Sequence, residues 1–461
     1  MLISTREVPG GREWTFQEAL FLGQAPDGGL FVPAALLPLP DGARAVLPTL
    51  TFAERAFVAA RHFLGDEIRD DLLRAVVHDA LNFPVPLREI EPGIHMLELF
   101  HGPTHAFKDV GARFMARMMS ALRDDDSPPV TILTATSGDT GGAVAHAFHR
   151  LPGVHVGVLY PLGKVSHRQE AQFAALGGNV TAVAVRGTFD DCQRLARQAF
   201  ADPALTAALS LTSANSINIG RLLPQTFYYI HALTELAQES PDSELVVSVP
   251  SGNFGNLTAG LIARRALGMS LARFVAATNE NSVVPEYLAG HGFHPRPSVE
   301  TISSAMDVGD PSNFRRILHL FGGDGGRPGD SARYGPQSGT LHSILTGSSW
   351  TDSHTPPLHP RPVAASRARG RPAHGSWTTR SAPRDEAVAR CTRHCPGNRP
   401  PREVRGDGRA ADRGDAADPA RDCAGNGPAC EVDRDCGGTG RIARGSDPWV
   451  GARNSSRIRE K

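Results

Sequence analysis

Lysine is scarce in this sequence, and that scarcity makes each lysine a candidate for amine chemistry. The chain has three lysines, Lys108, Lys164 and Lys461, and its other strongly basic side chains are all arginine. Arginine stays charged and cannot act as an amine nucleophile, whereas lysine can. Chance is the alternative, because three lysines must lie somewhere, so the residues around each one have to decide.

Lys108 has surroundings that suit a reactive amine. It lies in the segment 101–109, at the start of a predicted helix over 106–122, between Phe107 and Val110. A helix N-terminus and apolar neighbours both disfavour a charged ammonium group, which leaves the amine free to form a Schiff base. A surface lysine on an amphipathic helix is the alternative, and the spacing alone does not separate the two.

A first loop with the residues of an anion site spans 134–142. It contains Ser137, Asp139 and Thr140, follows a predicted strand and precedes a predicted helix. Such a loop presents backbone N–H groups and hydroxyls to an anion at a helix N-terminus. It is not a P-loop, because no Gly-Lys-Ser or Gly-Lys-Thr ends it. A plain strand–helix turn is the alternative.

A second loop, 251–256, also lies between an apolar strand and a helix. Gly252 and Gly255 are three residues apart, which lets the backbone approach a phosphate closely. This pattern is weak by itself. In combination with the first loop and Lys108 it indicates a site for a phosphorylated ligand.

The segment 213–221 is dense in hydrogen-bonding side chains. Asn215 and Ser216 supply amide and hydroxyl groups, and Arg221 ends the segment. Arginine with such donors suits a phosphate or a carboxylate. A capped helix start is the alternative. Together the loops predict a site for two anions, a cofactor phosphate and an anionic substrate, without naming the reaction.

The elements that position these residues alternate in the manner of an α/β enzyme. Strands are expected over 130–133, 154–159, 180–185 and 245–249. Helices are expected over 106–122, 143–149, 190–200 and 222–239. Strands that alternate with helices favour parallel-rich sheets covered by helices on both faces.

Bulk composition excludes several classes of function. The formal net charge of the 461-residue chain is zero, which gives no global attraction to nucleic acid or to an anionic membrane. The N-terminal residues are polar and lack the apolar core of a signal peptide, so we expect a cytoplasmic protein. Five of the six cysteines lie after residue 390 at irregular spacings, and we expect no metal site or disulfide framework.

The sequence changes character after about residue 323, and after Thr355 the α/β pattern is gone. The segment 356–461 consists mostly of Arg, Ala, Gly, Pro, Asp and Ser without a helical or strand period. Such a composition cannot bury enough apolar surface to offset chain entropy, which predicts a non-globular tail. A disordered regulatory tail is one interpretation. We favour translation out of frame, because GC-rich DNA read in a wrong frame yields this mixture.

In order and context, these motifs resemble the threonine synthase family of fold type II pyridoxal-phosphate enzymes, which are similar to tryptophan synthase β. The resemblance begins at Ser4-Thr5-Arg6 and the segment 25–30, and includes the segments around Lys108, 137–140, 213–221 and 252–256. It ends near 306–314 and covers about 320 residues.

The resemblance implies a two-domain architecture. It places a threonine-synthase-like N-terminal region at 1–90 and a catalytic core at 91–323. Within the core, the smaller domain would span about 91–190, and 191–323 would form part of the larger one. The segment 324–355 is transitional.

The resemblance also implies roles for individual residues. Lys108 would bind pyridoxal 5'-phosphate as a Schiff base and act as the catalytic group. The cofactor phosphate would be held by Gly252, Asn253, Phe254, Gly255 and Asn256. Asp139 would face the cofactor ring, and Ser137 and Thr140 the substrate carboxylate. The substrate phosphate would be bound by Asn215, Ser216 and Arg221.

By the same resemblance, the substrate is O-phospho-L-homoserine and the products are L-threonine and phosphate, the last step of threonine biosynthesis. A serine/threonine dehydratase of the same fold is an alternative. A catalytically impaired homologue that only binds a phosphorylated ligand is another. A monomer and a homodimer both stay open.

The C-terminal part departs from the family pattern. Members of the family close the large domain with a stretch that includes an Asp-Pro-His-Thr-Ala segment, whose hydroxyl faces the pyridine nitrogen. The segment 351–355, Thr-Asp-Ser-His-Thr, is only a superficial echo of it. Without the closing stretch, the large domain would expose apolar surface and the cofactor would lose one wall.

We therefore predict a frameshift in the gene and low activity of the 461-residue chain. Sequencing the codons for residues 320–360 and reading the three frames beyond them should reveal family-like sequence in a neighbouring frame. The purified chain should be poorly soluble and weakly active. A tail that is in frame throughout would contradict the frameshift, and full activity would contradict the predicted loss.

Overall fold

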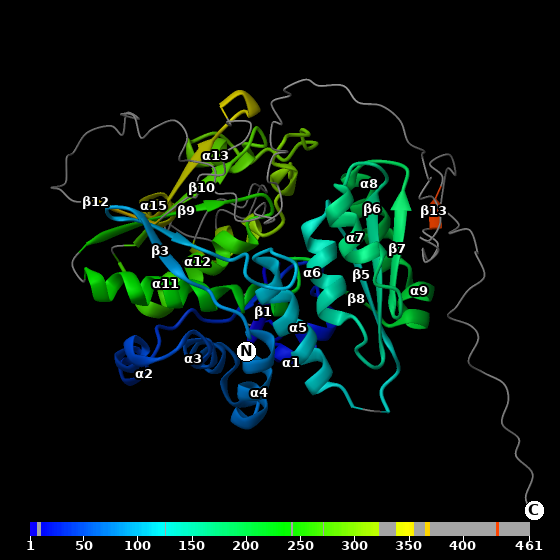
Figure 1. The fold of residues 1–461 in the computed structure, drawn as a ribbon, viewed down its shortest axis with the longest axis horizontal. Helices are drawn as coiled ribbons and strands as arrows, with labels where there is room; N and C mark the ends of the chain where they lie inside the picture. Colours follow the sequence, from blue (N-terminus) through cyan, green and yellow to red (C-terminus); the bar gives the residue numbers. More distant parts are fainter. Residues whose placement is uncertain are drawn as a thin grey trace, which may run out of the picture.

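The computed structural model describes the parts of the chain on which the predicted site lies. The described residues are 1–6, 11–124, 126–240, 243–270, 272–321, 338–354, 365–368 and 430–432. They form two groups of elements, each built on one sheet, with N-terminal helices beside both (Figure 1). The α/β prediction, with parallel strands and covering helices, is confirmed.

The first sheet has five strands in the order β13-β7-β6-β5-β8 and is parallel throughout. Its strands are β5 (Val130–Ala135), β6 (Val154–Pro161), β7 (Val180–Val185), β8 (Leu211–Ser213) and β13 (Cys430–Val432). Parallel neighbours need a crossover, usually a helix. The connecting helices are α6 (Asp139–Phe148), α7 (His167–Ala174), α8 (Phe189–Ala201) and α9 (Pro203–Leu209).

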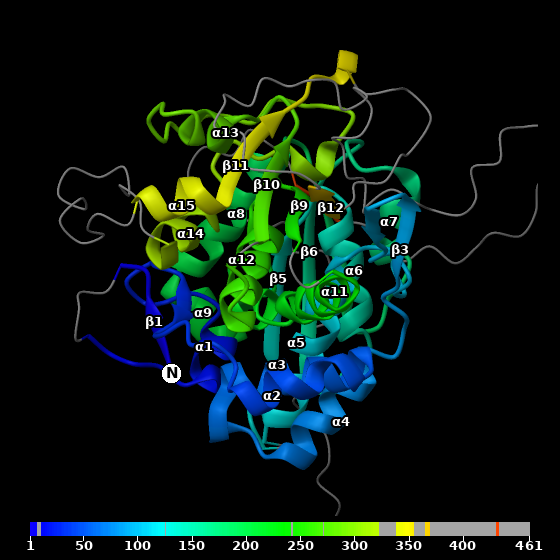
Figure 2. The ribbon, with the colours of Figure 1, turned by 90° about the vertical axis from the view of Figure 1, so that its left-hand side faces the viewer.

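The second sheet has six strands in the order β11-β10-β9-β12-β4-β3. The parallel strands are β9 (Glu244–Pro250), β10 (Ala272–Thr278) and β11 (Leu345–Ser349); the antiparallel ones are β3 (Leu87–Glu91), β4 (Ile94–Leu97) and β12 (Ala365–Ala368). Around it lie α11 (Gln225–Glu239), α12 (Gly255–Leu267), α13 (Val283–Leu288), α14 (Phe314–Phe321) and α15 (Ser338–Ile344). Helix α15 lies against β10 and β11 (Figure 2).

The N-terminal part is mostly helical. Its strands are β1 (Leu2–Ser4) and β2 (Phe31–Pro33), and its α-helices are α1 (Phe16–Leu22), α2 (Asp41–Val46), α3 (Phe52–Leu64) and α4 (Asp70–Ala80). Short 3-10 turns are η1 (Leu47–Thr49) and η2 (Gly65–Glu67), and others in the chain are η3 (Ser304–Met306) and η6 (Asp352–His354). Helices α1 and α3 begin with capping boxes, because Thr15 and Thr51 are each followed three residues later by a glutamate.

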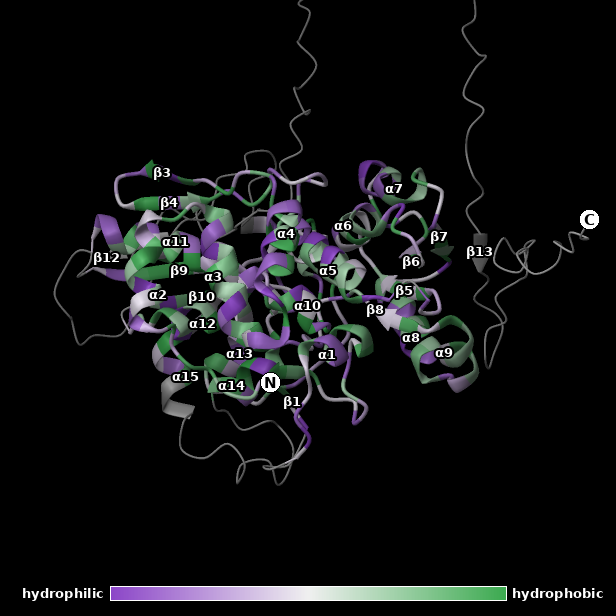
Figure 3. Cartoon of the chain, turned by 90° about the horizontal axis from the view of Figure 1, so that it is seen from below, coloured by the Kyte–Doolittle hydropathy of each residue, from purple (hydrophilic) through white to green (hydrophobic). Residues whose placement is uncertain are grey.

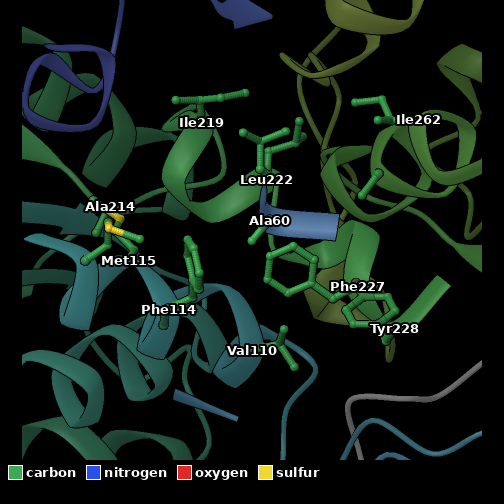
Figure 4. Packing of buried hydrophobic residues seen from close by; sticks show 14 of the residues in the cluster. Ala60, Val110, Phe114, Met115, Ala214, Ile219, Leu222, Phe227, Tyr228 and Ile262 are labelled. Carbon is green, nitrogen blue, oxygen red and sulfur yellow. The ribbon is translucent and has the colours of Figure 1, made fainter. Parts of the chain in front are cut away.

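Helix α5 (Lys108–Leu122) lies at the centre of the core and makes contacts with α1, α4, α6 and α10 (Ile219–Leu222). Phe114 packs edge-on against Phe227 with ring centroids 5.4 Å apart (Figure 4). Gly111 lets α5 approach α10 closely, because a Cβ at this position would lie 2.7 Å from the Arg221 carbonyl oxygen. Packing of this helix therefore fixes the position of its first residue, Lys108.

The helices around the sheets show both hydrophobic and hydrophilic residues, as expected of helices with one face toward a core (Figure 3). In the part of the chain that the structure describes, no helix has both the length and the apolar character needed to cross a bilayer.

Two of the predicted helices have starts that lie more than two residues from the observed ones. The helix expected over 143–149 begins at Asp139, because the pair Gly141-Gly142 is helical here rather than part of the loop. The helix expected over 222–239 is divided into α10 and α11 around Pro224, whose ring cannot continue a helix from the preceding residue. The predicted tail, 356–461, lies outside the described residues apart from β12 and β13.

Candidate active site

A pocket between the two sheets brings the predicted residues together. It is lined at the carboxyl ends of β5 and β9, at the first turns of α5, α6 and α12, and by a segment around η3. The predicted site residues in its lining are Lys108, Ser137, Asp139, Thr140, Asn215, Ser216, Arg221, Gly252, Asn253, Phe254, Gly255 and Asn256. Every predicted residue thus lies at one site, and their individual roles stay predictions.

Lys108 enters this pocket from the first turn of α5. Its side chain is 14% exposed, and its Nζ lies 3.3 Å from Oδ2 of Asp139, whose side chain is 9% exposed. The Phe107 ring also faces the amine, with 4.6 Å between Nζ and the ring centroid. Sequence reasoning considered the helix N-terminus and the apolar neighbours of Lys108, and it did not anticipate the contact with the Asp139 carboxylate. The amine therefore has a carboxylate partner within the pocket.

Asp109 folds the preceding loop back onto the start of α5. Its carboxylate accepts hydrogen bonds from the Thr104 backbone N–H at 2.9 Å and from the Thr104 hydroxyl at 2.6 Å. Gly102 packs against the same carboxylate, where a Cβ would lie 2.5 Å from Oδ2. Burial raises the pKa of Asp109, while the Thr104 hydrogen bonds oppose that rise. This local folding fixes the backbone on both sides of Lys108.

Asp139 is held from a second direction by a residue that sequence reasoning did not identify. Gln169 Nε2 donates to Asp139 Oδ1 at 2.6 Å, and Gln169 also completes the capping box that Ser166 begins at α7. The Thr136 hydroxyl accepts hydrogen bonds from the N–H groups of Gly138 and Gly141 at 2.9 and 2.8 Å, which shapes the loop. The Asp139 carboxylate therefore lies between Lys108 and Gln169.

The loop 252–256 has the backbone conformation of an anion site. Phe254, the residue before α12, has φ +62° in the left-handed region, and no side chain caps the first N–H groups of the helix. The amide oxygen of Asn256 accepts hydrogen bonds from the hydroxyls of Tyr228 at 2.5 Å and Tyr229 at 2.9 Å. An uncapped helix N-terminus with its amides toward a pocket suits a phosphate.

Asn215 lies in the pocket lining, but its side chain is bonded to β5. Its Oδ1 accepts a hydrogen bond from the Thr134 hydroxyl at 2.5 Å, and its Nδ2 donates to the Ala135 carbonyl at 3.1 Å. Asn215, which the sequence predicts to bind the substrate phosphate, therefore also links the segment 213–221 to the five-stranded sheet. Sequence alone could not show this contact between residues about eighty positions apart.

Arg221 is 2% exposed and reaches the pocket from α10. One terminal nitrogen donates to the Ala214 carbonyl at 2.5 Å, and among the described residues its Nε has no hydrogen-bond partner. Burial lowers the pKa of Arg221 to about 10, while the negative charge of Asp109 opposes that fall. The guanidinium stays charged at neutral pH and retains an unused donor, as a site for an anion requires.

Sequence reasoning missed a polar group behind Ser216. Asn313 Nδ2 donates to the Ser216 hydroxyl at 3.2 Å, and Arg316 donates to the carbonyls of Ser216 and Ile217 at 3.0 and 2.6 Å. Arg316 is completely buried, and burial lowers its pKa to about 9. One indication of this group is present in the sequence: Asn313 lies in the segment 306–314, which belongs to the family resemblance but had no assigned role.

Comparison with known proteins agrees with this arrangement. The family of pyridoxal-phosphate dependent enzymes matches residues 86–328, more than half of the chain, and the threonine synthase N terminus matches residues 1–81. The threonine synthase of Haemophilus influenzae is 50% identical over 307 residues, which cover 67% of this chain and 71% of the relative. This chain belongs to the threonine synthase family.

Solved structures of threonine synthases support the same assignment. The crystal structure of threonine synthase from Escherichia coli matches with a TM-score of 0.68 at 43% identity, over 77% of this chain and 78% of that one. The structure of PLP-bound threonine synthase from Brucella melitensis matches with a TM-score of 0.67 at 33% identity, over 76% and 78%. The predicted fold type and family are confirmed.

As a member of the threonine synthase family, this chain is a pyridoxal-phosphate dependent enzyme, and its pocket suits that cofactor. A largely buried lysine amine opens into it, and two helices, α6 and α12, begin there. The N-cap residues of both helices make no side-chain bond, although the Thr136 hydroxyl accepts from one amide in the first turn of α6. The segment 351–354 does not supply a further wall: in the described structure none of its residues lines the pocket, and Asp352 accepts a hydrogen bond from the Ile302 N–H at 3.0 Å.

We predict that Gly252→Ala weakens the binding of pyridoxal phosphate. A Cβ at this position would lie 2.9 Å from Met306 Cα and 3.0 Å from the Ala305 carbonyl oxygen, both of them backbone atoms of the opposite wall. Overpacking typically costs about 1–3 kcal/mol, so the dissociation constant should rise roughly five- to a hundredfold. Titration of the cofactor into the apoprotein measures it.

The matched control is Gly42→Ala in α2, where nothing lies within 4 Å of the new Cβ. This control should bind the cofactor as the parent chain does. Equal cofactor affinities of the Gly252→Ala variant and the control would contradict the prediction, because cofactor binding would then not depend on the close approach at Gly252.

Proposed function

We propose that this chain converts O-phospho-L-homoserine and water to L-threonine and phosphate. The observation on which this proposal rests is one pocket whose lining combines the Lys108 side chain, the first turns of α6 and α12, and a buried arginine. The relatives, named threonine synthases, give the reaction, and the pocket offers two anion sites for a substrate with a carboxylate and a phosphate.

The cofactor is assigned to the side of the pocket formed by Lys108 and the loop 252–256. The amides of this loop and the start of α12 would bind its phosphate, because they combine free donors with the positive end of a helix. Lys108 would bind its aldehyde, and Asp139 would lie against its ring. When bound, pyridoxal phosphate supplies an electron-withdrawing ring that acts as an electron sink.

The substrate is assigned to the two remaining groups of donors. Ser137 and Thr140, at the loop and the first turn of α6, would bind the substrate carboxylate at that helix N-terminus. Ser216 and Arg221 would bind the substrate phosphate. Asn215 would keep the segment 213–221 close to β5. Arginine suits the phosphate because its planar donors match phosphate oxygens.

Lys108 would also move the protons of the reaction. Its amine would take the proton from Cα and release it again before it takes the proton from Cβ, while the C–O bond at Cγ breaks and phosphate leaves. Water would then add its oxygen at Cβ, and protons would return to Cα and Cγ, which gives threonine. After each proton uptake, the nearby Asp139 carboxylate would stabilise the charged amine, and Gln169 would keep that carboxylate in place.

Replacing Lys108 by alanine should abolish both the bound-cofactor spectrum and the activity. The variant should lose the visible absorbance of lysine-bound pyridoxal phosphate, and its rate of threonine formation should fall about a thousandfold or more, as expected for a lost acid–base group. Spectroscopy and a coupled phosphate assay measure the two effects. The control Lys164→Ala removes an exposed lysine that pairs with Glu300, and should retain both. An undiminished absorbance band in Lys108→Ala would refute the assignment.

Replacing Arg221 by alanine should weaken substrate capture more than the chemical step. We expect KM for O-phospho-L-homoserine to rise roughly ten- to a hundredfold, because a charge-assisted hydrogen bond to phosphate is lost. Initial rates and inhibition by inorganic phosphate measure the effect. The control Arg264→Ala removes another arginine that donates to backbone carbonyls, on the far part of α12. An unchanged KM in Arg221→Ala would contradict its role.

A further inference from the structure

A cluster of polar side chains lies directly behind the pocket and has a fixed direction of hydrogen bonding. We call it the Ser216 cluster, and its members are Ser216, Asn253, Ser312, Asn313 and Arg316. Ser216 and Asn253 line the pocket, whereas the other three lie behind them. Asn313 and Arg316 are completely buried, so each of their hydrogen bonds has to be made within the protein.

The orientation of each amide in this cluster follows from groups that can only donate. The Ser312 backbone N–H lies 2.7 Å from Oδ1 of Asn253, so this atom must be the amide oxygen. Nη1 of Arg316 lies 2.5 Å from Oδ1 of Asn313. Because a guanidinium has no acceptor, this Oδ1 must also be the amide oxygen. Both amides are thereby fixed, and their NH₂ groups must point the other way.

Both NH₂ groups point at the same oxygen, the hydroxyl of Ser216. Nδ2 of Asn253 donates to it at 2.6 Å and Nδ2 of Asn313 at 3.2 Å. A serine hydroxyl has two acceptor lone pairs and one hydrogen. With both lone pairs occupied, only the hydroxyl hydrogen is left to form a hydrogen bond. Because Ser216 lines the pocket, that hydrogen is available to an acceptor there.

We infer that Asn253 and Asn313 are positioning residues that hold the Ser216 hydroxyl as a donor to a phosphate oxygen in the pocket. This inference rests on the proposed phosphate-binding function and deepens it. A hydroxyl fixed in this way donates to an acceptor such as a phosphate oxygen. The cluster therefore offers one oriented donor to a phosphorylated ligand.

Arg316 has two functions in this arrangement. It orients Asn313, and it also bonds the carbonyls of Ser216 and Ile217, which fixes the backbone from which the hydroxyl projects. Its fourth bond is to the Phe31 carbonyl at 2.9 Å in the N-terminal part. In the described structure its hydrogen-bond partners are three carbonyls and one amide, with no carboxylate among them.

The test replaces an amide by a carboxylate of the same shape. Asn313→Asp keeps an acceptor for Arg316 but removes the donor to Ser216, so the hydroxyl hydrogen turns toward the new carboxylate. Asn253→Asp makes the same exchange at a partly exposed position, which guards against a variant of the buried residue that fails to fold. The control Asn82→Asp changes an exposed amide that also accepts from an arginine, Arg113, away from the pocket.

Binding is measured on the full chain in two ways. Calorimetry gives the affinity of the cofactor-saturated protein for inorganic phosphate, and cofactor titration gives the affinity of the apoprotein for pyridoxal phosphate. We expect Asn253→Asp and Asn313→Asp to weaken one of the two affinities about tenfold or more, as for a lost hydrogen bond to a charged group. Loss of phosphate affinity identifies the substrate phosphate as the partner, and loss of cofactor affinity identifies the cofactor phosphate. Unchanged affinities for both would overturn the inference.

A double-mutant cycle with Ser216→Ala separates hydrogen-bond direction from charge repulsion. If Asn313 acts through the hydroxyl, Asn313→Asp should change the affinity by less than about twofold once Ser216 is alanine, because coupled effects are not additive. If the new carboxylate only repels phosphate, the loss persists in that background, and the inference is overturned.

The outcome is also separable from that of the proposed reaction. A parent chain that binds phosphate through this cluster but forms no threonine from O-phospho-L-homoserine would contradict the reaction alone. A parent chain that forms threonine, and whose Asn313→Asp variant keeps both affinities, would contradict the inference alone.

Discussion

The ion pair between Lys108 and Asp139 is the contact on which the pocket depends, because it joins the first turns of α5 and α6. Both side chains are largely buried, and a buried charge without a partner is strongly destabilising. The two helices must therefore keep their relative position. Core packing of α5 through Phe114 holds one of them, and Gln169 holds the carboxylate of the other.

The N-terminal part supports the pocket without lining it. Asn218 donates through its side chain to the Leu20 carbonyl, and Arg316 donates to the Phe31 carbonyl, so α1 and β2 contact the back of the segment 213–221 and of α14. The match of residues 1–81 to a threonine synthase N terminus thus has a physical basis. These residues provide backbone acceptors for two buried side chains, Asn218 and Arg316.

Local patterns predicted much of the fold and the position of the site, whereas partners distant in sequence escaped prediction. Strand β7 has the predicted bounds, since its apolar run is bounded by turn residues. The start of α6 was missed because glycine is unfavourable in helices, yet Gly141 fits here against Thr136, Val158 and Phe173. Arg316 could not be recognised, because its acceptor at Phe31 is 285 residues away.

The distribution of charge in the pocket has a consequence for the direction in which a ligand enters. At one end, Lys108 and Asp139 neutralise each other. Arg221 also lines the pocket, and Arg316 lies behind Ser216 with no carboxylate bonded to it in the described structure. At Arg221 the lining therefore carries positive charge before anything binds. A molecule with a doubly negative phosphate at one end and a zwitterionic amino acid at the other is turned by that field, phosphate first, before it makes any contact.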